Sequence, residues 1–338
     1  MKLLKTGSLI IICFLLTGLI GFTSVAFGQV KLNYSIFFPA PHKNSVLATE
    51  WAKEIEKRTS GKVQVTMFYG GTLTPPDKCY DGVVKGISDI GFSVFSYSMG
   101  KFPLTEVIDL PLGYKSAVGA TKLINEFYNK FNPKEFDEVK VMYLHAHGPG
   151  ILHTKAAVNK LEDLKGKKIR STGTIAKIVT ALGGTPVAMP MPDTYDSLSR
   201  GVVDGTMAPV ETLEGWKVGE VIKFTTEDLG AAYSVAFFVV MNKAKWNSLP
   251  PDIQKIIEKV NEEWIEKTGQ LWDSIDKSGR EFSLKLGNKF IPLSKEEDAK
   301  WAKAVTPMFD EYVKEKKAKG LPADEVLKFC VDRLKQLQ

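Results

Sequence analysis

The sequence predicts an α/β protein with two lobes and one long helix. Two observations lead to this fold class. Strands and helices alternate in two separate stretches, over about residues 30–92 and 161–209, as they do in sheets covered by helices. After Pro250-Pro251 the pattern stays helical to about Lys285. At 1.5 Å per residue such a helix extends roughly 50 Å, wider than one small domain, so we expect it to run alongside both lobes.

The first α/β stretch begins with Val30–Ile36, where apolar and polar residues alternate as in a half-buried strand. A helix follows from about Ser45, with apolar side chains at helical spacing, and Ser60-Gly61-Lys62 ends it. The later elements that we expect in this lobe are strands at 63–68, 86–92 and 139–145 and helices at 77–85 and 117–130.

The second stretch, Leu161–Pro209, follows a strand–helix–strand–helix–strand order with short Gly/Pro turns. Ala232–Met241 is a dense apolar strand, long enough to be buried on both faces. Residues 295–337 predict further helices, divided at Gly320-Leu321-Pro322. The order of elements therefore gives each lobe its own set of strands.

The start of the chain has the layout of a secretory signal peptide. Lys2 and Lys5 precede an apolar run from Leu9 to Phe22, and Ala26-Phe27-Gly28 supplies small residues for cleavage after Gly28. The run is short for a bilayer span of about 20 residues, which argues against an uncleaved anchor. We expect residues 1–28 to be removed and the mature protein to be periplasmic.

The composition argues against a nucleic-acid function. The formal net charge is +6, and it falls to +4 when Lys2 and Lys5 are removed. Basic and acidic residues are interspersed, with no run of five like charges and no nucleic-acid-binding motif. The mature chain has two cysteines, Cys79 and Cys330. An exported protein can form a disulfide, but the spacing leaves open whether these two pair.

Ligands in such folds bind outside the carboxyl ends of the strands and between lobes. Arg170 lies at such a strand end, where its planar guanidinium matches a carboxylate bidentately. The alternative is a surface arginine beside the lysine-rich turn 165–168. The loops that we expect to form the cleft are 37–42, 69–73, 95–100, 145–150, 170–174, 189–193 and 208–211.

Other candidates lie in these loops. His145 and His147 could face one side of a strand as a metal pair, but no Asp, Glu or Cys completes a shell, so we expect neither a metal nor a cofactor. His147 is instead a candidate hydrogen-bond donor to a ligand. Aromatic and Met side chains in the loops favour an apolar ligand body, with core packing as the alternative. The candidate ligand-binding residues are Arg170, His147, Phe38, His42, Phe95, Met191, Pro209 and Glu211.

Five short motifs occur in a fixed order: Ser60-Gly61-Lys62-Val63, Gly70-Gly71-Thr72-Leu73, Val84–Gly91, Asp163–Arg170 and Gly201-Val202-Val203-Asp204-Gly205. In this order, after a signal peptide, the chain resembles the DctP-type solute-binding proteins of tripartite ATP-independent periplasmic (TRAP) transporters. The resemblance implies a two-lobed periplasmic binding protein fold with hinge strands and a long bracing helix. It also implies that Arg170 binds a substrate carboxylate.

The sequence departs from the family pattern at two positions. Gly150 stands where many members carry a second arginine, about twenty residues before Arg170, and Ala208 stands where asparagine is frequent. These changes make the cleft less polar. We therefore expect specificity from apolar neighbours rather than from additional charges.

The resemblance implies lobe I from residues 29–147 and 236–275, lobe II from 148–235 and 276–303, and C-terminal helices from 304–338 that pack back on the lobes. The predicted function is a receptor that delivers an organic acid to a membrane permease, without catalysis. An exported small-acid hydrolase and an extracytoplasmic ligand sensor are the alternatives. Against an enzyme, Ser274-Ile275-Asp276-Lys277 and Lys267-Thr268-Gly269 resemble penicillin-interacting motifs only in reversed order on one helix.

Overall fold

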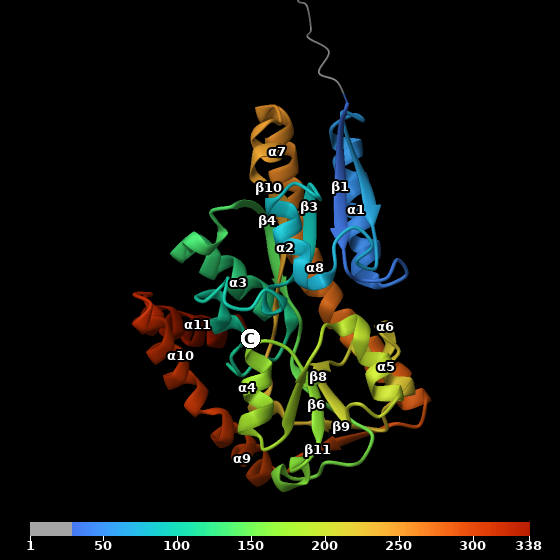
Figure 1. Cartoon of the computed structure of the whole chain (residues 1–338), viewed down its shortest axis with the longest axis vertical. Helices are drawn as coiled ribbons and strands as arrows, with labels where there is room; N and C mark the ends of the chain where they lie inside the picture. The colour runs from blue at the N-terminus through green and yellow to red at the C-terminus, as the bar shows by residue number, and fades with distance from the viewer. Residues whose placement is uncertain (1–28) are drawn as a thin grey trace, which may run out of the picture.

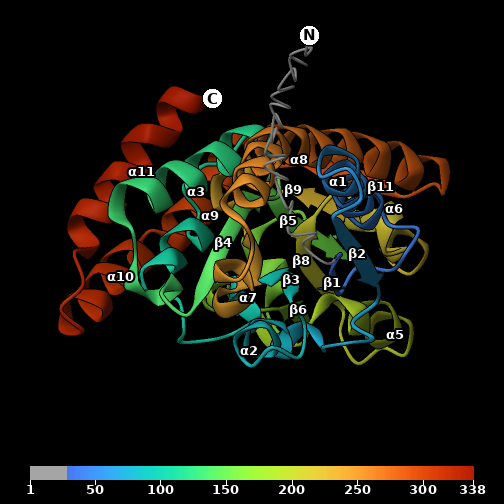
Figure 2. The same cartoon turned by 90° about the horizontal axis from the view of Figure 1, so that it is seen from above.

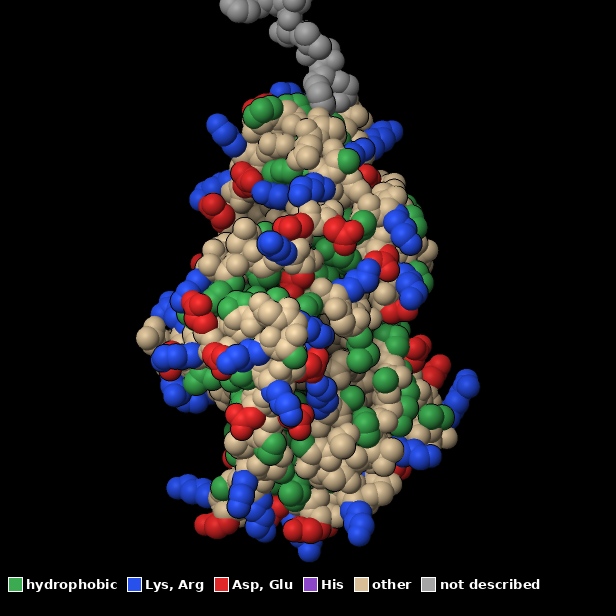
Figure 3. Space-filling model, turned by 60° about the vertical axis from the view of Figure 1, so that its left-hand side comes forward, with side chains coloured by type: hydrophobic (Ala, Val, Ile, Leu, Met, Phe, Trp, Pro, Cys, Tyr) green, Lys and Arg blue, Asp and Glu red, His purple; other side chains and the backbone are tan. Residues whose placement is uncertain are grey.

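Two β-sheets, one above the other in Figure 1, are the frameworks of two lobes. The structure is a computed structural model that describes residues 29–338. The predicted signal peptide, residues 1–28, lies outside the described residues. Among residues 29–338, no helix has the length and apolar character needed to cross a membrane. Charged side chains of both signs are interspersed over the face shown in Figure 3.

Lobe I, the upper lobe in Figure 1, is built on a five-stranded sheet with the order β2-β1-β3-β10-β4. β1 pairs in parallel with β2 and β3, whereas β10 is antiparallel to both β3 and β4. Its strands are β1 (Val30–Ile36), β2 (Val63–Phe68), β3 (Ile90–Val94), β4 (Val139–Ala146) and β10 (Ala236–Asn242). The helices of this part are α1 (Lys43–Arg58), α2 (Cys79–Val84), α3 (Ala117–Phe131) and α7 (Lys243–Asn247).

Lobe II contains a six-stranded sheet with the order β11-β9-β5-β8-β6-β7. Parallel pairs at β6, β7 and β8 place the carboxyl ends of these strands at one edge. Its strands are β5 (Gly150–Thr154), β6 (Lys168–Ser171), β7 (Thr185–Ala188), β8 (Gly205–Pro209), β9 (Phe224–Glu227) and β11 (Lys289–Pro292). Its helices are α4 (Thr174–Ala181), α5 (Thr194–Ser199) and α6 (Thr212–Gly215).

The long helix α8 (Pro251–Lys285) extends along both lobes, as Figures 1 and 2 show. In lobe I its Asn261 side chain accepts a 2.9 Å hydrogen bond from the buried Trp51 indole. In lobe II its Asp276 carboxyl accepts a 2.8 Å hydrogen bond from the backbone N–H of Glu211. α8 therefore contacts elements of both lobes.

Three helices end the chain: α9 (Lys295–Val305), α10 (Pro307–Ala318) and α11 (Ala323–Leu337). α10 contacts both lobes. The Tyr312 hydroxyl donates to the carbonyl of Leu104 in lobe I at 2.8 Å, and Glu315 pairs with Lys177 of lobe II at 3.2 Å. In Figure 1 the C-terminal helices, drawn in red, run from the lower lobe toward the upper one.

The predicted two-lobed α/β fold with a long helix is confirmed, and α8 covers the predicted residues. The residue boundaries proposed for the lobes stay a prediction. Three strands of lobe II, β5, β9 and β11, are absent from the prediction, and β3 begins at Ile90 rather than at residue 86. Within residues 29–338 both Cys79 and Cys330 are buried free thiols, so they do not pair with each other.

Gly279 on α8 allows the helix to approach the chain next to the cleft. A Cβ atom at this position would lie 2.9 Å from the Cα of Glu211 and closer still to the carbonyl oxygen of Val210. Helix propensity alone predicts that Gly279→Ala stabilises the protein by about 1 kcal/mol. We expect the opposite, a loss of about 1–3 kcal/mol in the free energy of unfolding, because backbone atoms must move apart. Chemical denaturation measures the difference.

The control is Lys277→Ala, an exposed position on the same helix. This change should alter the free energy of unfolding by no more than about 0.5 kcal/mol. Stabilisation by Gly279→Ala would show that the helix and the Val210–Glu211 segment are not in close contact.

Candidate functional site

A narrow cavity of about 50 Å³ lies between the two lobes. Its walls come from the β1 and β3 ends of lobe I, the β6 and β8 ends of lobe II, the segment that leads into β10, and α8. The residues that line it are Phe37, Phe38, Val94, Tyr97, His147, Arg170, Thr172, Met191, Met207, Ala208, Pro209, Glu211, Trp216, Tyr233, Val235, Phe237 and Trp272. Most of these side chains are apolar or aromatic, and the charged ones are Arg170 and Glu211.

Arg170 projects from β6 and is only 5% exposed. Its Nε donates a 3.0 Å hydrogen bond to the carbonyl of Met189. None of the ion pairs among residues 29–338 includes Arg170. A buried guanidinium with one carbonyl partner keeps unused N–H donors and an uncompensated charge, which is costly unless an anion binds.

Tyr97 connects the lobes beside Arg170. Its hydroxyl oxygen, on lobe I, accepts a 2.9 Å hydrogen bond from the backbone N–H of Met191 in lobe II. Burial raises the pKa of Tyr97, and the nearby Arg170 charge partly opposes this rise. The phenol therefore stays protonated at neutral pH, and its O–H can donate to an acceptor in the cavity.

Tyr233 occupies the space beside Gly150. A Cβ atom on Gly150 would lie 2.5 Å from Cζ of the Tyr233 ring, so the ring fills the position of any larger side chain there. Burial also raises the pKa of Tyr233, with the Arg170 charge again opposing the rise. The neutral phenol of Tyr233 therefore lies near Arg170. Among the residues that line the cavity, Arg170 is the cation.

Aromatic rings from distant parts of the chain form the apolar wall. Phe37 stacks on Trp216 with ring centroids 6.0 Å apart and planes 14° from parallel, which joins lobe I to lobe II. Phe237 lies 5.1 Å from Trp272 of α8. Such a wall is suited to a flat apolar ligand body.

The His-x-His pair belongs to this aromatic core. Burial lowers the pKa of His145 to about 3 and that of His147 to about 4, so both rings are neutral. The His145 Nδ1 accepts a 3.0 Å hydrogen bond from the Trp272 indole. No group of three or more metal-ligating side chains occurs in the described part of the chain.

The hydrogen bond of His147 changes its expected role. Its Nδ1 contacts the carbonyl oxygen of Gly148, which can only accept, so Nδ1 carries the proton. Nε2 of the neutral ring is then an acceptor. In this tautomer His147 offers a ligand an acceptor, whereas the sequence suggested a donor, and a role for His147 in ligand binding stays a prediction.

Glu211 is 2% exposed and is bonded to His42, with 3.1 Å between the carboxylate Oε2 and His42 Nε2. His42 itself caps α1, because its Nδ1 accepts from the backbone N–H of Asn44. The pair separates the cavity from a surface groove lined by His42, Lys43 and Lys217.

The structure brings six of the eight candidate residues to the cavity: Arg170, His147, Phe38, Met191, Pro209 and Glu211. His42 lies behind Glu211 and supports it. Phe95 lies outside this cavity and packs on Phe102, 4.7 Å away. The cavity residues that the candidate set omits include Tyr97, Trp216, Tyr233, Phe237 and Trp272.

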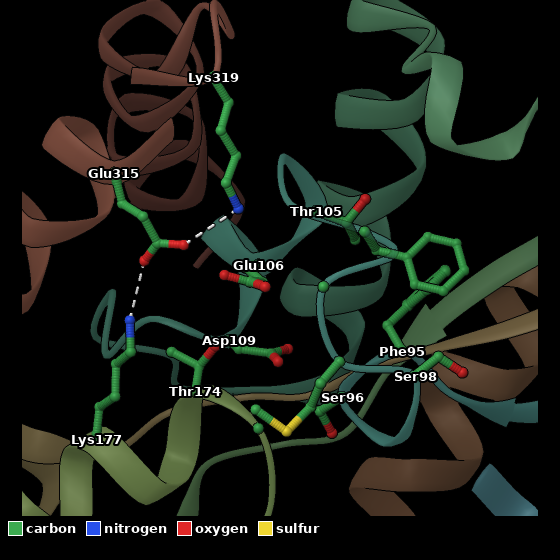
Figure 4. A pocket seen from close by; sticks show the side chains of 14 residues that line it. Phe95, Ser96, Ser98, Thr105, Glu106, Asp109, Thr174, Lys177, Glu315 and Lys319 are labelled. Carbon is green, nitrogen blue, oxygen red and sulfur yellow. Dashed lines mark hydrogen bonds and ion pairs between the residues drawn. The ribbon is translucent and has the colours of Figure 1, made fainter. Parts of the chain in front are cut away.

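Phe95 lines a second cavity of about 220 Å³, shown in Figure 4. This cavity is larger, but its rim charges already pair with one another. Glu315 of α10 bridges Lys177 and Lys319 at 3.2 and 3.5 Å. Because its cations are neutralised and exposed, the arginine-containing cavity is the better candidate for anion binding.

Comparison with known proteins agrees with this geometry. The model of the family described as bacterial extracellular solute-binding protein, family 7 (DctP) matches residues 39–316. The chain belongs to this DctP family. It is a TRAP-type solute-binding protein, and the family consists of substrate-binding receptors found in the periplasm.

Solved DctP-family structures superpose over most of this chain. A TRAP periplasmic solute-binding protein from Desulfovibrio salexigens is 34% identical, covering 91% of this chain and 97% of that one, with a TM-score of 0.81. A marine metagenome protein specific for aromatic acid ligands, in complex with metahydroxyphenylacetate, is 29% identical. The match covers 92% of this chain and 100% of that one, with a TM-score of 0.88. A Rhodoferax ferrireducens protein in complex with benzoate is 27% identical. The match covers 91% of this chain and 98% of that one, with a TM-score of 0.87.

Gly173 is a contact between the lobes of this DctP-type protein. Its φ is +50°, and a Cβ atom there would lie 2.7 Å from the Cβ of Ser96 across the cleft. We expect Gly173→Ala to favour a more open arrangement of the lobes. Small-angle scattering should then report a larger radius of gyration than for the unmodified protein.

Gly166→Ala is the matched control, because Gly166 also has a positive φ (+79°) but no atom within 4 Å of the added Cβ. Both substitutions strain the backbone, and only one disturbs the interlobe contact. Identical scattering curves for the two variants would show that Gly173 and Ser96 do not limit closure.

Proposed function

We propose that this protein binds a small organic acid with one carboxylate, and that Arg170 pairs with that carboxylate inside the interlobe cavity. One observation carries the proposal: Arg170 is only 5% exposed, and its side chain has a carbonyl partner but no carboxylate partner among residues 29–338. A bound carboxylate neutralises this charge and accepts the remaining N–H donors, in a water-poor site where such pairs are strong.

The rest of the cavity supports an aromatic acid. Trp216, Phe237 and Trp272 offer ring faces, and the space beside Gly150 holds a neutral phenol instead of a second cation. A second carboxylate on the ligand has no cationic partner here. Two structural relatives with 27–29% identity were solved with aromatic acids, metahydroxyphenylacetate and benzoate.

Closure follows from contacts that only the closed form makes. Arg170 belongs to lobe II, whereas Tyr97 and Phe38 belong to lobe I, so a ligand between them contributes binding energy to the closed state. The closed receptor then delivers the acid to the membrane permease of a TRAP transporter. Export requires removal of the leader, for which we propose cleavage after Gly28.

The residues that line the cavity favour a binding protein over a hydrolase. Neither Ser nor Cys is among the residues that line the cavity, and Thr172, with an aliphatic hydroxyl, lies 3.3 Å from the Ser96 hydroxyl rather than beside a base. A hydrolase needs an activated nucleophile next to a base. The proposed role asks the protein only to bind, enclose and release its ligand.

Calorimetry with benzoate tests the role of Arg170. We expect the unmodified protein to bind it, and Arg170→Ala to weaken binding by about 2–4 kcal/mol, the range for removing one partner of a buried charge pair. The benzoate affinity of Arg170→Lys should lie between those of the unmodified protein and Arg170→Ala, because an ammonium keeps the charge but not the planar, bidentate geometry of the guanidinium.

Arg200→Ala is the control, since Arg200 is an exposed arginine of the same lobe outside the cavity. It should bind benzoate as the unmodified protein does. Unchanged affinity in Arg170→Ala would contradict the proposed carboxylate site. Stabilisation of the protein by neutral sugars alone would contradict the ligand class.

A further inference from the structure

We infer that the ligand carries a hydrogen-bond donor, a hydroxyl or an amino N–H, at the end opposite its carboxylate, and that Glu211 binds this donor. The inference rests on the proposed function and narrows its substrate class. It starts from a second buried charge in the cavity. Glu211 is 2% exposed, borders the cavity, and has no lysine or arginine partner within residues 29–338.

The neighbours of His42 identify its tautomer. The backbone N–H of Asn44 donates to Nδ1 at 3.2 Å, so this nitrogen is an acceptor and Nε2 carries the proton of the neutral ring. Nε2–H then donates to Glu211 Oε2 at 3.1 Å. His42 therefore holds the Glu211 carboxylate in position with one hydrogen bond and acts as a positioning residue.

The carboxylate of Glu211 keeps unused acceptor capacity. An ionised carboxylate offers about four lone-pair sites, and His42 occupies one of them. Oε1 has no hydrogen-bond partner among the described residues, and the backbone N–H of Glu211 is engaged with Asp276 instead. A hydrogen-bond donor on a ligand in the cavity can use this capacity, because Glu211 lines the cavity.

His147 adds a second acceptor to the same cavity. Its proton is on Nδ1, facing Gly148, so Nε2 presents a lone pair. No donor from residues 29–338 reaches this nitrogen. The cavity thus offers two acceptors, Glu211 and His147, in addition to the N–H donors of Arg170.

The sheet separates the cation from the anion. Arg170 on β6 is in register with Thr206 on β8. Glu211 lies five residues after Thr206, just beyond the end of β8. At about 3.3 Å per strand residue, Pro209 alone is roughly 10 Å along the strand from Thr206. Arg170 and Glu211 form no ion pair with each other in the described chain. A ligand with the carboxylate at one end and the donor at the other would therefore bridge the two charges.

The same arrangement disfavours a dicarboxylate. A second carboxylate at the Glu211 end would face a like charge in a buried site, which is strongly unfavourable. A hydroxyl or amino group instead replaces its hydrogen bond to water with one to an ionised acceptor. The cavity therefore distinguishes substituted from unsubstituted acids through hydrogen bonding rather than through size.

Calorimetry on the full mature chain with benzoate, 3-hydroxybenzoate, 4-hydroxybenzoate and 3-aminobenzoate tests this inference. We expect at least one substituted acid to bind about 10- to 100-fold more tightly than benzoate, the range for a hydrogen bond to a charged group. The 3-amino compound distinguishes an N–H from an O–H donor.

Glu211→Gln should reduce this preference, the ratio of the affinity for the substituted acid to that for benzoate, to a few-fold, because the variant keeps the shape of the side chain but loses its charge. Glu214→Gln, an exposed position on the next turn, should keep the full preference. Circular dichroism of each variant checks folding, and the preference of the unmodified protein tests the inference even if a variant does not fold.

Equal affinity for all four acids would overturn the inference and leave the carboxylate site of Arg170 intact. A preference that survives in Glu211→Gln would also overturn it, because the donor would then bind elsewhere. Failure of every acid to bind would reject the proposed function together with the inference.

Discussion

The guanidinium of Arg170 is a buried positive charge without a carboxylate partner among the described residues. An unpaired charge in a buried position is unfavourable, which is why we propose that it binds an anion. Protonated phenols at Tyr97 and Tyr233 provide neutral neighbours, and aromatic rings exclude water. In the proposed mechanism, ligand binding removes this electrostatic penalty, and the difference favours the closed state.

The proposed site is shared between the two lobes. Arg170 and Met191 are on lobe II and Tyr97 is on lobe I, so the site is complete only when the lobes meet. α8 extends along both lobes. Close approaches at Gly173 and Gly279 let the lobes and the helix come near enough for side chains from several separate segments to line one small cavity.

The sequence predicts well those features that depend on local pattern. The long helix follows from a proline start and an uninterrupted apolar spacing, and Arg170 follows from its place in a motif at a strand end. β9 and β11 have four residues each, too short for alternation to identify them. Tyr233 and Trp272 reach the cavity from far along the chain, so no local signal places them there. The tautomer of His147 depends on one carbonyl, that of Gly148, which only the three-dimensional structure reveals.

We propose that one cavity binds the ligand's carboxylate at Arg170 and the opposite end of the ligand at Glu211. The most direct measurement is a crystal structure of the mature protein with a bound hydroxybenzoate. Our account predicts the carboxylate on the Arg170 guanidinium, the ring against Trp216 and Phe237, and the hydroxyl within hydrogen-bonding distance of Glu211. A carboxylate bound away from Arg170, or a ligand in the larger cavity beside Phe95, would contradict it.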